Sequence, residues 1–190
     1  MLKLIYSICM LSFIIVAPLM NAQDEMSAEQ KAWMDYMTPG PMHELMAKSV
    51  GEWKTTITYW MDPAAEPTIT EGTSTVEMIM GGRYLKSTDK SMMMGMPFEG
   101  MNLQGYDNAT GEFIAVWIDN FGTGISVSRG TYDEETKTIT FFGSMVNPVD
   151  GKEMNYRQTH QIIDDNNHVF EMFTIEDGKE TKNMHLTFSR

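Results

Sequence analysis

Polar and apolar residues alternate in short runs from Gly51 to the end of the chain. The runs are rich in Thr, Val, Ile, Tyr and Phe, and clusters of Gly, Asp, Asn and Pro separate them. This pattern is typical of β-strands joined by tight turns. Because no segment of helical periodicity interrupts the runs, a βαβ organisation is excluded. We predict about ten antiparallel strands, over residues 52–62, 68–80, 83–92, 98–107, 112–119, 124–132, 137–144, 152–163, 168–176 and 181–189.

The segments between the runs predict hairpins. Residues that favour turn conformations, Asp, Asn and Gly, cluster at 107–111, 133–136, 148–151, 164–167 and 176–178. Strands that hairpins join are neighbours in a sheet, so we expect a simple up-and-down order.

Several runs are apolar on both faces, as in residues 113–118. One face therefore cannot be wholly exposed to solvent. A closed barrel with a filled interior and a partly covered outer face explains the pattern, and so does a two-layer sandwich. We favour the barrel because closure leaves no strand edge unpaired.

The first 22 residues predict a signal peptide. Lys3 precedes an apolar run over residues 4–19, and Asn21-Ala22 offers a cleavage site. The run is shorter than the ~20 residues of a membrane-spanning helix, and we rank a membrane anchor second. We therefore expect a secreted or periplasmic protein with no membrane span in the mature chain. Cys9, the single cysteine, lies in this run, so disulfides are excluded from the mature protein.

Residues 23–50 predict a short helical segment ahead of the barrel domain at 51–190. Ser27 can cap a first helix that carries Trp33 and Tyr36, and Pro39-Gly40-Pro41 ends it before a second helix over residues 42–48. An apolar stripe on the first helix suggests two roles, a lid over a cavity or a helix packed against a barrel end.

The net charge of the whole chain is −12. An acidic surface repels phosphate backbones, so nucleic acid is excluded as a partner. The sequence does not determine the oligomeric state.

Both ends of the predicted barrel carry a distinctive residue. Gly51-Glu52-Trp53 opens the first strand, and Arg190 follows the last one. This arrangement resembles the calycin superfamily of lipocalin-like barrels, which implies that Arg190 lies over the Trp53 ring in a cation–π contact.

The middle of the chain carries an ordered set of short motifs. They are GGRYL (81–85), GMPFEG (95–100), GYDN (105–108), WIDN (117–120), RGT (129–131), DGK (150–152) and YR (156–157). The set resembles the bacterial DUF1579 family, over about residues 45 to 190. The resemblance implies a lipocalin-like barrel of unknown activity, and it supplies no catalytic residues.

Five residues of these motifs are candidates for a site, namely Arg83, Tyr106, Trp117, Asp119 and Arg157. A charged side chain among apolar strand residues is costly to bury unless it is paired or faces a polar cavity. We expect Asp119 and Arg157 to pair. Strand alternation places Trp117 and Asp119 on one face, as an aromatic platform beside a carboxylate. A structural ion pair in a packed core is the competing interpretation.

Metal and haem sites are weakly supported. The chain has 20 methionines, several of them in residues 92–96, and thioethers are ligands for Cu(I). Adaptable packing over a cavity mouth is the better explanation, because adjacent strand residues point to opposite faces. Among the four scattered histidines, His160 is the candidate for a haem ligand, since it lies mid-strand on the face of Tyr156. We predict neither cofactor and no metal site.

Our first hypothesis is a binding protein whose interior, lined in part by Trp53, Tyr59 and Trp117, holds a small apolar or amphipathic molecule. The second is a structural or protein-interaction module of the cell envelope. An enzyme that uses Asp119 for proton transfer is third.

Overall fold

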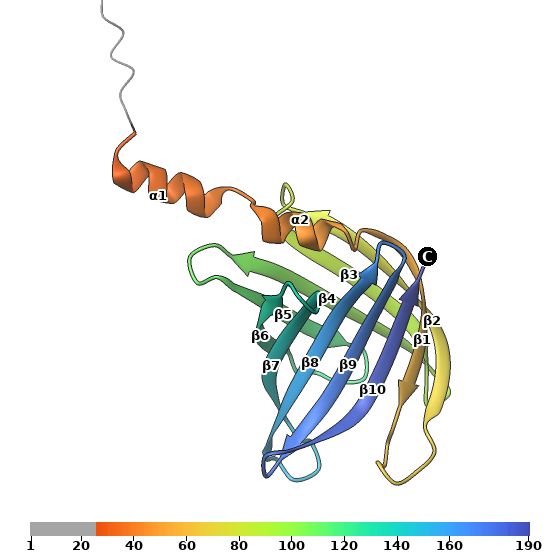
Figure 1. Ribbon diagram of the computed structural model, residues 1–190. Coiled ribbons are helices and arrows are strands. Elements are labelled where there is room, and N and C mark those ends of the chain that lie inside the picture. Colours follow the sequence, from red (N-terminus) through yellow and green to blue (C-terminus); the bar gives the residue numbers. More distant parts are fainter. Residues whose placement is uncertain (1–25) are drawn as a thin grey trace, which may run out of the picture.

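The computed structural model describes residues 26–190 and shows two short helices followed by ten strands (Figure 1). The predicted signal peptide lies outside these residues and stays a prediction. The elements are α1 (Ala28–Met37), α2 (Pro41–Ala47), β1 (Gly51–Tyr59), β2 (Thr68–Ile79), β3 (Tyr84–Met93), β4 (Met96–Asp107), β5 (Glu112–Asp119), β6 (Ser126–Asp133), β7 (Thr138–Val146), β8 (Glu153–Asp164), β9 (Asn167–Glu176) and β10 (Lys179–Ser189).

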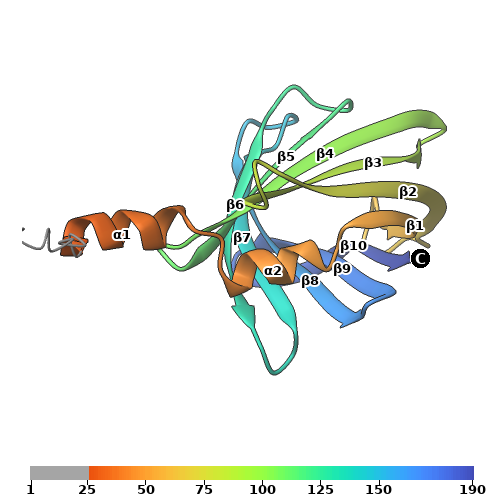
Figure 2. The ribbon, with the colours of Figure 1, turned by 90° about the horizontal axis from the view of Figure 1, so that it is seen from above.

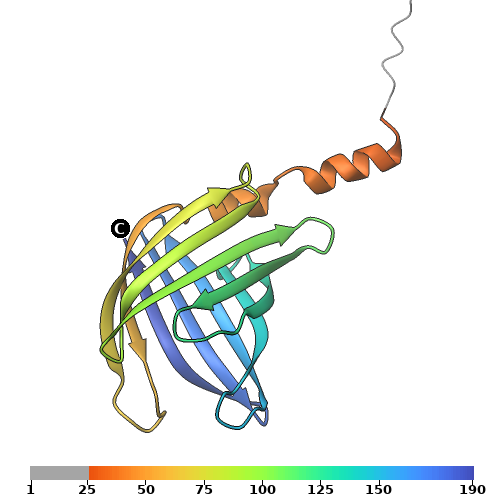
Figure 3. The same cartoon turned by 180° about the vertical axis from the view of Figure 1, so that it is seen from behind.

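The ten strands form a closed antiparallel barrel in up-and-down order. Each strand pairs with its neighbours in sequence, and β1 closes the barrel by pairing with β10 from Lys54 opposite Ser189 to Tyr59 opposite Met184. Figure 3 shows the wall of β2 to β5 from behind. The predicted barrel is confirmed over the sandwich, and the predicted strand limits differ from the observed ones by no more than three residues.

The helix α2 covers one end of the barrel (Figure 2). Its side chains Leu45 and Met46 are buried, and they join a cluster of strand residues that fills this end. The strand members of the cluster are Trp53, Val76, Leu85, Phe113, Ile139, Phe141 and Ile162. We call this the closed end.

The helix α1 begins as predicted but packs differently. Ser27 caps it, because its Oγ accepts from the Gln30 backbone N–H at 3.1 Å. The helix then extends away from the barrel (Figure 1), and its apolar stripe stays about half exposed, with Trp33 at 58% and Met37 at 48%. Neither predicted role therefore describes α1, because all its residues are exposed and none belongs to the core.

The predicted contact between Arg190 and Trp53 is confirmed. The guanidinium carbon lies 4.3 Å from the centre of the indole ring. The same guanidinium donates to the backbone oxygens of Val50 at 2.6 Å and Lys48 at 3.1 Å. The last residue of the chain is thus tied to the segment that leads from α2 into β1.

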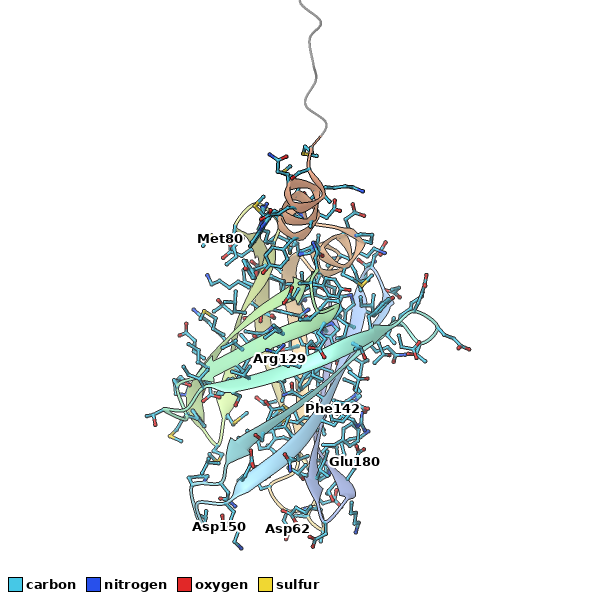
Figure 4. All side chains as sticks on the ribbon, turned by 90° about the vertical axis from the view of Figure 1, so that its left-hand side faces the viewer. Asp62, Met80, Arg129, Phe142, Asp150 and Glu180 are labelled. Atoms are coloured by element: carbon cyan, nitrogen blue, oxygen red, sulfur yellow. The ribbon has the colours of Figure 1, made fainter. Side chains whose placement is uncertain are left out.

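The opposite end of the barrel carries the turns β1–β2, β3–β4, β5–β6, β7–β8 and β9–β10. Figure 4 labels Asp62 and Asp150 in two of these turns, far from the helices. We call this the open end, because neither α1 nor α2 covers it. Among the described residues, no helix combines the length and the apolar character needed to cross a membrane.

Candidate functional site

A cavity of about 400 Å³ occupies the barrel interior. It runs from Leu45 and Met46 of α2 at the closed end to Phe121 beside the open end. Phe121 is 37% exposed. Inward-facing residues of all ten strands line it, because alternate residues of each strand point into the barrel.

The cavity has two unlike walls. The wall formed by β9 and β10 is mainly apolar, with His168 as its polar member; its apolar residues are Phe170, Met172, Met184, Leu186 and Phe188. The wall formed by β2, β3 and β4 is largely polar and includes Ser74, Ser87, Asp89, Ser91, Asn102 and Gln104. The interior is therefore suited to a molecule with one apolar and one polar side.

Asp89 carries the charge of the polar wall. It lies opposite Ser74 of β2, and the Ser87 hydroxyl donates to its Oδ2 at 2.8 Å. Burial raises the pKa of the Asp89 carboxyl, and the Ser74 and Ser87 hydroxyls partly offset that rise. Ser74 is 1% exposed, and its hydroxyl makes no hydrogen bond of good geometry. The hydroxyl nevertheless lies close enough to Asp89 to lower the pKa of that carboxyl.

Trp117 and Asp119 lie on one face, as predicted, and contact each other. The indole Nε1 donates to Asp119 Oδ2 at 2.7 Å. Asp119 Oδ1 accepts from the backbone N–H groups of Phe121 at 2.9 Å and Gly122 at 3.0 Å. One carboxylate oxygen therefore holds the indole, and the other holds the backbone of the β5–β6 turn. This arrangement gives Asp119 a positioning role.

Trp117 belongs to an aromatic group beside the open end. Its ring stacks on Phe98 with centroids 6.3 Å apart, and Phe98 meets Phe121 edge to face at 5.4 Å. Gly100 makes room for the indole, since a Cβ at this position would overlap the six-membered ring. The glycine therefore decides where the indole lies.

Two histidines lie together deeper in the barrel. The distance from His160 Nε2 to His168 Nδ1 is 3.2 Å, and the His168 ring lies 4.6 Å from the Trp53 ring. Burial, together with the nearby His168, lowers the pKa of His160 to about 4. The His160 side chain is partly accessible because it faces the cavity. Both imidazoles are neutral at pH 7, since burial also lowers the pKa of His168.

The expected pair of Asp119 and Arg157 does not form. Arg157 follows the buried Tyr156 and therefore points outward, where its Nε and Nη2 donate to Glu180 at 2.7 and 2.6 Å. Its guanidinium also lies 4.1 Å from the centre of the Phe173 ring. This prediction was wrong because it ignored the face on which strand alternation places Arg157.

Three other predicted residues lie outside the cavity. Arg83 donates to the Met37 backbone oxygen at 2.6 Å and so holds the end of α1. Tyr106 packs on Phe113 with ring centroids 4.9 Å apart. Tyr59 is buried at the end of β1, where its hydroxyl accepts from the Met94 N–H at 3.4 Å.

Of the eight predicted residues, four line the cavity: Trp53, Trp117, Asp119 and His160. The prediction missed the polar wall, Asp89 above all. The signal was available, because Ser87 and Asp89 share a face with the apolar Leu85 at a spacing of two residues.

The methionine-rich segment contributes little to the cavity. Met93 lines it, whereas Met92, Met94 and Met96 are each about half exposed at the β3–β4 turn. Within residues 26–190, no group of three or more His, Asp or Glu side chains is arranged to hold a metal ion.

Comparison with known proteins identifies one family and structures with a likeness to the barrel. One family model, described as a protein of unknown function (DUF1579), matches residues 38–190. The crystal structure of Rv2717c from M. tuberculosis is similar with a TM-score of 0.60 and 15% identity, and the match covers 80% of this chain and 99% of that chain. A redesigned β-barrel matches with a TM-score of 0.39 and 14% identity, over 77% of this chain and 94% of the other. The likeness to Rv2717c concerns the fold alone. No curated protein matches the sequence.

Proposed function

We propose that the barrel binds a small amphipathic molecule in its interior. The chain belongs to the DUF1579 family, whose model matches residues 38–190. The observation that carries the proposal is the cavity of about 400 Å³, which lies within the usual range of ligand sites. Its apolar β9–β10 wall and polar β2–β4 wall offer burial to one side of a ligand and hydrogen bonds to the other. The large side chains of the closed-end cluster form the floor of this cavity and do not fill it.

A neutral fluorescent probe tests the proposal directly. N-phenyl-1-naphthylamine becomes brighter when it enters an apolar site, and we expect saturable binding with one site per chain. Native mass spectrometry of the purified protein should also show a co-purified small molecule or a probe adduct. Absence of saturable probe binding by the folded protein would contradict the proposal.

Two variants on adjacent residues locate the binding. Leu186 lines the cavity, whereas Thr187 is exposed on the outer face of the same strand. Leu186→Trp fills the interior and should weaken probe binding about tenfold or more, a change of about 1.4 kcal/mol. Thr187→Trp adds the same group outside and should leave the affinity unchanged. Equal effects of both variants would place the probe on the outer surface.

A second candidate function is a docking module, and the exposed stripe of α1 supports it. Trp33, Met34, Tyr36 and Met37 are each 47–58% exposed on one short helix. The expected partner is another protein of the cell envelope. Replacing Trp33 and Tyr36 by Ser should abolish its capture without changing probe binding to the barrel. A protein that stays monomeric and retains no envelope partner would contradict this function.

We also propose that the protein is exported and acts outside the cytoplasm. The support is the order of Lys3, an apolar run and Asn21-Ala22 in the sequence. N-terminal sequencing of protein recovered from the periplasm or the medium should show a chain that begins at Gln23. A full-length chain in the cytoplasm would overturn this proposal.

A further inference from the structure

Asp89 lacks a counter-ion inside the barrel. Within residues 26–190, none of the ion pairs includes Asp89. The Asp89 carboxylate accepts a hydrogen bond of good geometry from the Ser87 hydroxyl, at 2.8 Å. A carboxylate that is mostly buried and held by a neutral hydroxyl is costly unless a positive group joins it. Burial accordingly raises the pKa of this carboxyl.

An aromatic ring shares the inner face of the neighbouring strand with this carboxylate. Asp89 is directly opposite Gly100 in the β3–β4 pair. The Trp117 ring occupies the space that a side chain at position 100 would take. Side chains directly opposite each other on one face of a sheet are about 5 Å apart. The six-membered ring of the indole therefore lies over Gly100, on the inner face of the strand that pairs with Asp89.

Among the described lining residues, no positive side chain points into the cavity to receive an anion. Lys90 borders the cavity, but it is exposed and follows Asp89, so its side chain lies on the other face of β3. His160 and His168 line the cavity as neutral imidazoles at pH 7, because burial lowers both pKa values. The other charged group of the lining is the Asp119 carboxylate. The electrostatics of the interior thus favour a cation over an anion.

We propose that the barrel prefers amphipathic molecules with a protonated amine, whose ammonium group lies between the Asp89 carboxylate and the Trp117 ring. A carboxylate and an aromatic ring together are the groups that stabilise a partly desolvated ammonium ion. The apolar body of the molecule then lies along Phe170, Met172 and Leu186 of the β9–β10 wall. This inference rests on the proposed ligand-binding function and specifies the head group.

Three probes of equal chain length test the preference. Dodecylammonium, dodecanol and dodecanoate are each used to displace N-phenyl-1-naphthylamine from the wild-type protein at pH 7, below their aggregation concentrations. We expect dodecylammonium to bind at least about tenfold more tightly than dodecanoate, with dodecanol between them. This order should persist at 0.5 M NaCl, since a partly buried pair is screened less than surface charges.

Matched variants separate Asp89 from the general acidity of the protein. Asp89→Asn removes the buried charge and should reduce the difference between dodecylammonium and dodecanoate to less than about threefold. Asp62→Asn removes one exposed charge from the β1–β2 turn at the open end and should leave the tenfold difference intact. Asp89→Ser serves as a second variant if the Asn variant does not fold.

The wild-type protein provides a measurement that needs no variant. The carboxyl ¹³C resonance of Asp89 should shift when dodecylammonium is added and should stay in place with dodecanoate. Failure of the neutral fluorescent probe to bind would overturn the proposed function itself. Probe binding without an ammonium preference, or a preference that survives Asp89→Asn, would overturn this inference and leave the proposed function standing.

Discussion

The closed and the open ends of the barrel differ in what fills them. At the closed end, α2 and seven strand residues form a packed core in which Phe113 is fully buried. Toward the middle and the open end, small residues such as Ser74, Ser87 and Ser128 point inward, and a cavity remains. The same strands run through both regions, so hydrogen bonding does not distinguish them. Side-chain volume at the inward positions therefore decides how thick the packed floor of the barrel is and where the cavity begins.

The two ends of the barrel also have different expected roles, the closed end in stability and the open end in ligand binding. The closed end concentrates apolar burial and the contacts of Arg190 with Trp53. The open end carries the aromatic group of Phe98, Trp117 and Phe121 with little cover above it. A substitution should therefore affect unfolding at one end and ligand access at the other.

The largest contrast is expected between two phenylalanines. Phe113→Ala leaves a cavity in the closed-end core and should reduce the free energy of unfolding by about 3–5 kcal/mol. Phe121→Ala removes a ring that is already 37% exposed at the open end and should cost less than about 1 kcal/mol. Urea unfolding of both variants measures the difference. Equal losses would show that the two ends form a single uniform core.

Acid should destabilise the protein through the buried histidine pair. The pKa of His160 is about 4 in the folded protein against an ordinary value of 6.5. Between these values the unfolded chain binds a proton that the folded protein excludes, so stability falls as the pH drops from about 6.5 to 4. The expected loss is about 2–3 kcal/mol.

The variant His160→Gln should remove this part of the pH dependence, as measured by unfolding at several pH values. His185→Gln is the matched control, because His185 lies 3.1 Å from Glu171 and is not part of the buried pair. A pH profile that is unchanged in His160→Gln would show that another group is responsible.

Gly100 tests the packing of the open end. Gly100→Ala places a Cβ against the Trp117 ring and should cost about 2 kcal/mol, with a shift in tryptophan fluorescence as the indole moves. Gly124→Ala is the control, since nothing lies within 4 Å of a Cβ there. Its effect should stay within about 0.5 kcal/mol. If Gly100→Ala is equally mild, the indole is free to move.

The smallest effect is expected for the contact that ties the chain end to the closed end. Arg190→Ala removes the cation–π contact with Trp53 and the bonds to three backbone oxygens, and it should reduce stability by about 1 kcal/mol. Arg190→Lys keeps the charge and should recover part of that loss. Thermal unfolding measures both, and a neutral Arg190→Ala would show that the contact adds nothing.

Much of the fold could be predicted because its signals are local. The period of two in runs such as 112–119 and the Asx and Gly turns, for example 107–111, depend on neighbouring residues only. Half of the predicted site residues line the cavity for the same reason, since alternation places Trp117 and Asp119 on one face. Partners on other strands were harder to predict. Arg157 pairs with Glu180, 23 residues further along the chain, because the register of β8, β9 and β10 brings the two side chains together.

The sequence by itself determined that the chain forms ten antiparallel strands in up-and-down order and that α1 and α2 precede them. The contact of Arg190 with Trp53 was implied by the resemblance to calycin barrels, and the structure contains it. Only the tertiary structure decided that the interior is hollow, that Asp89 lies in it without a counter-ion, and that α1 stays exposed. Strand formation and turns follow from the preferences of adjacent residues. A cavity and its charges depend on how side chains from distant strands fill a common space, which the register and the closure of the barrel set.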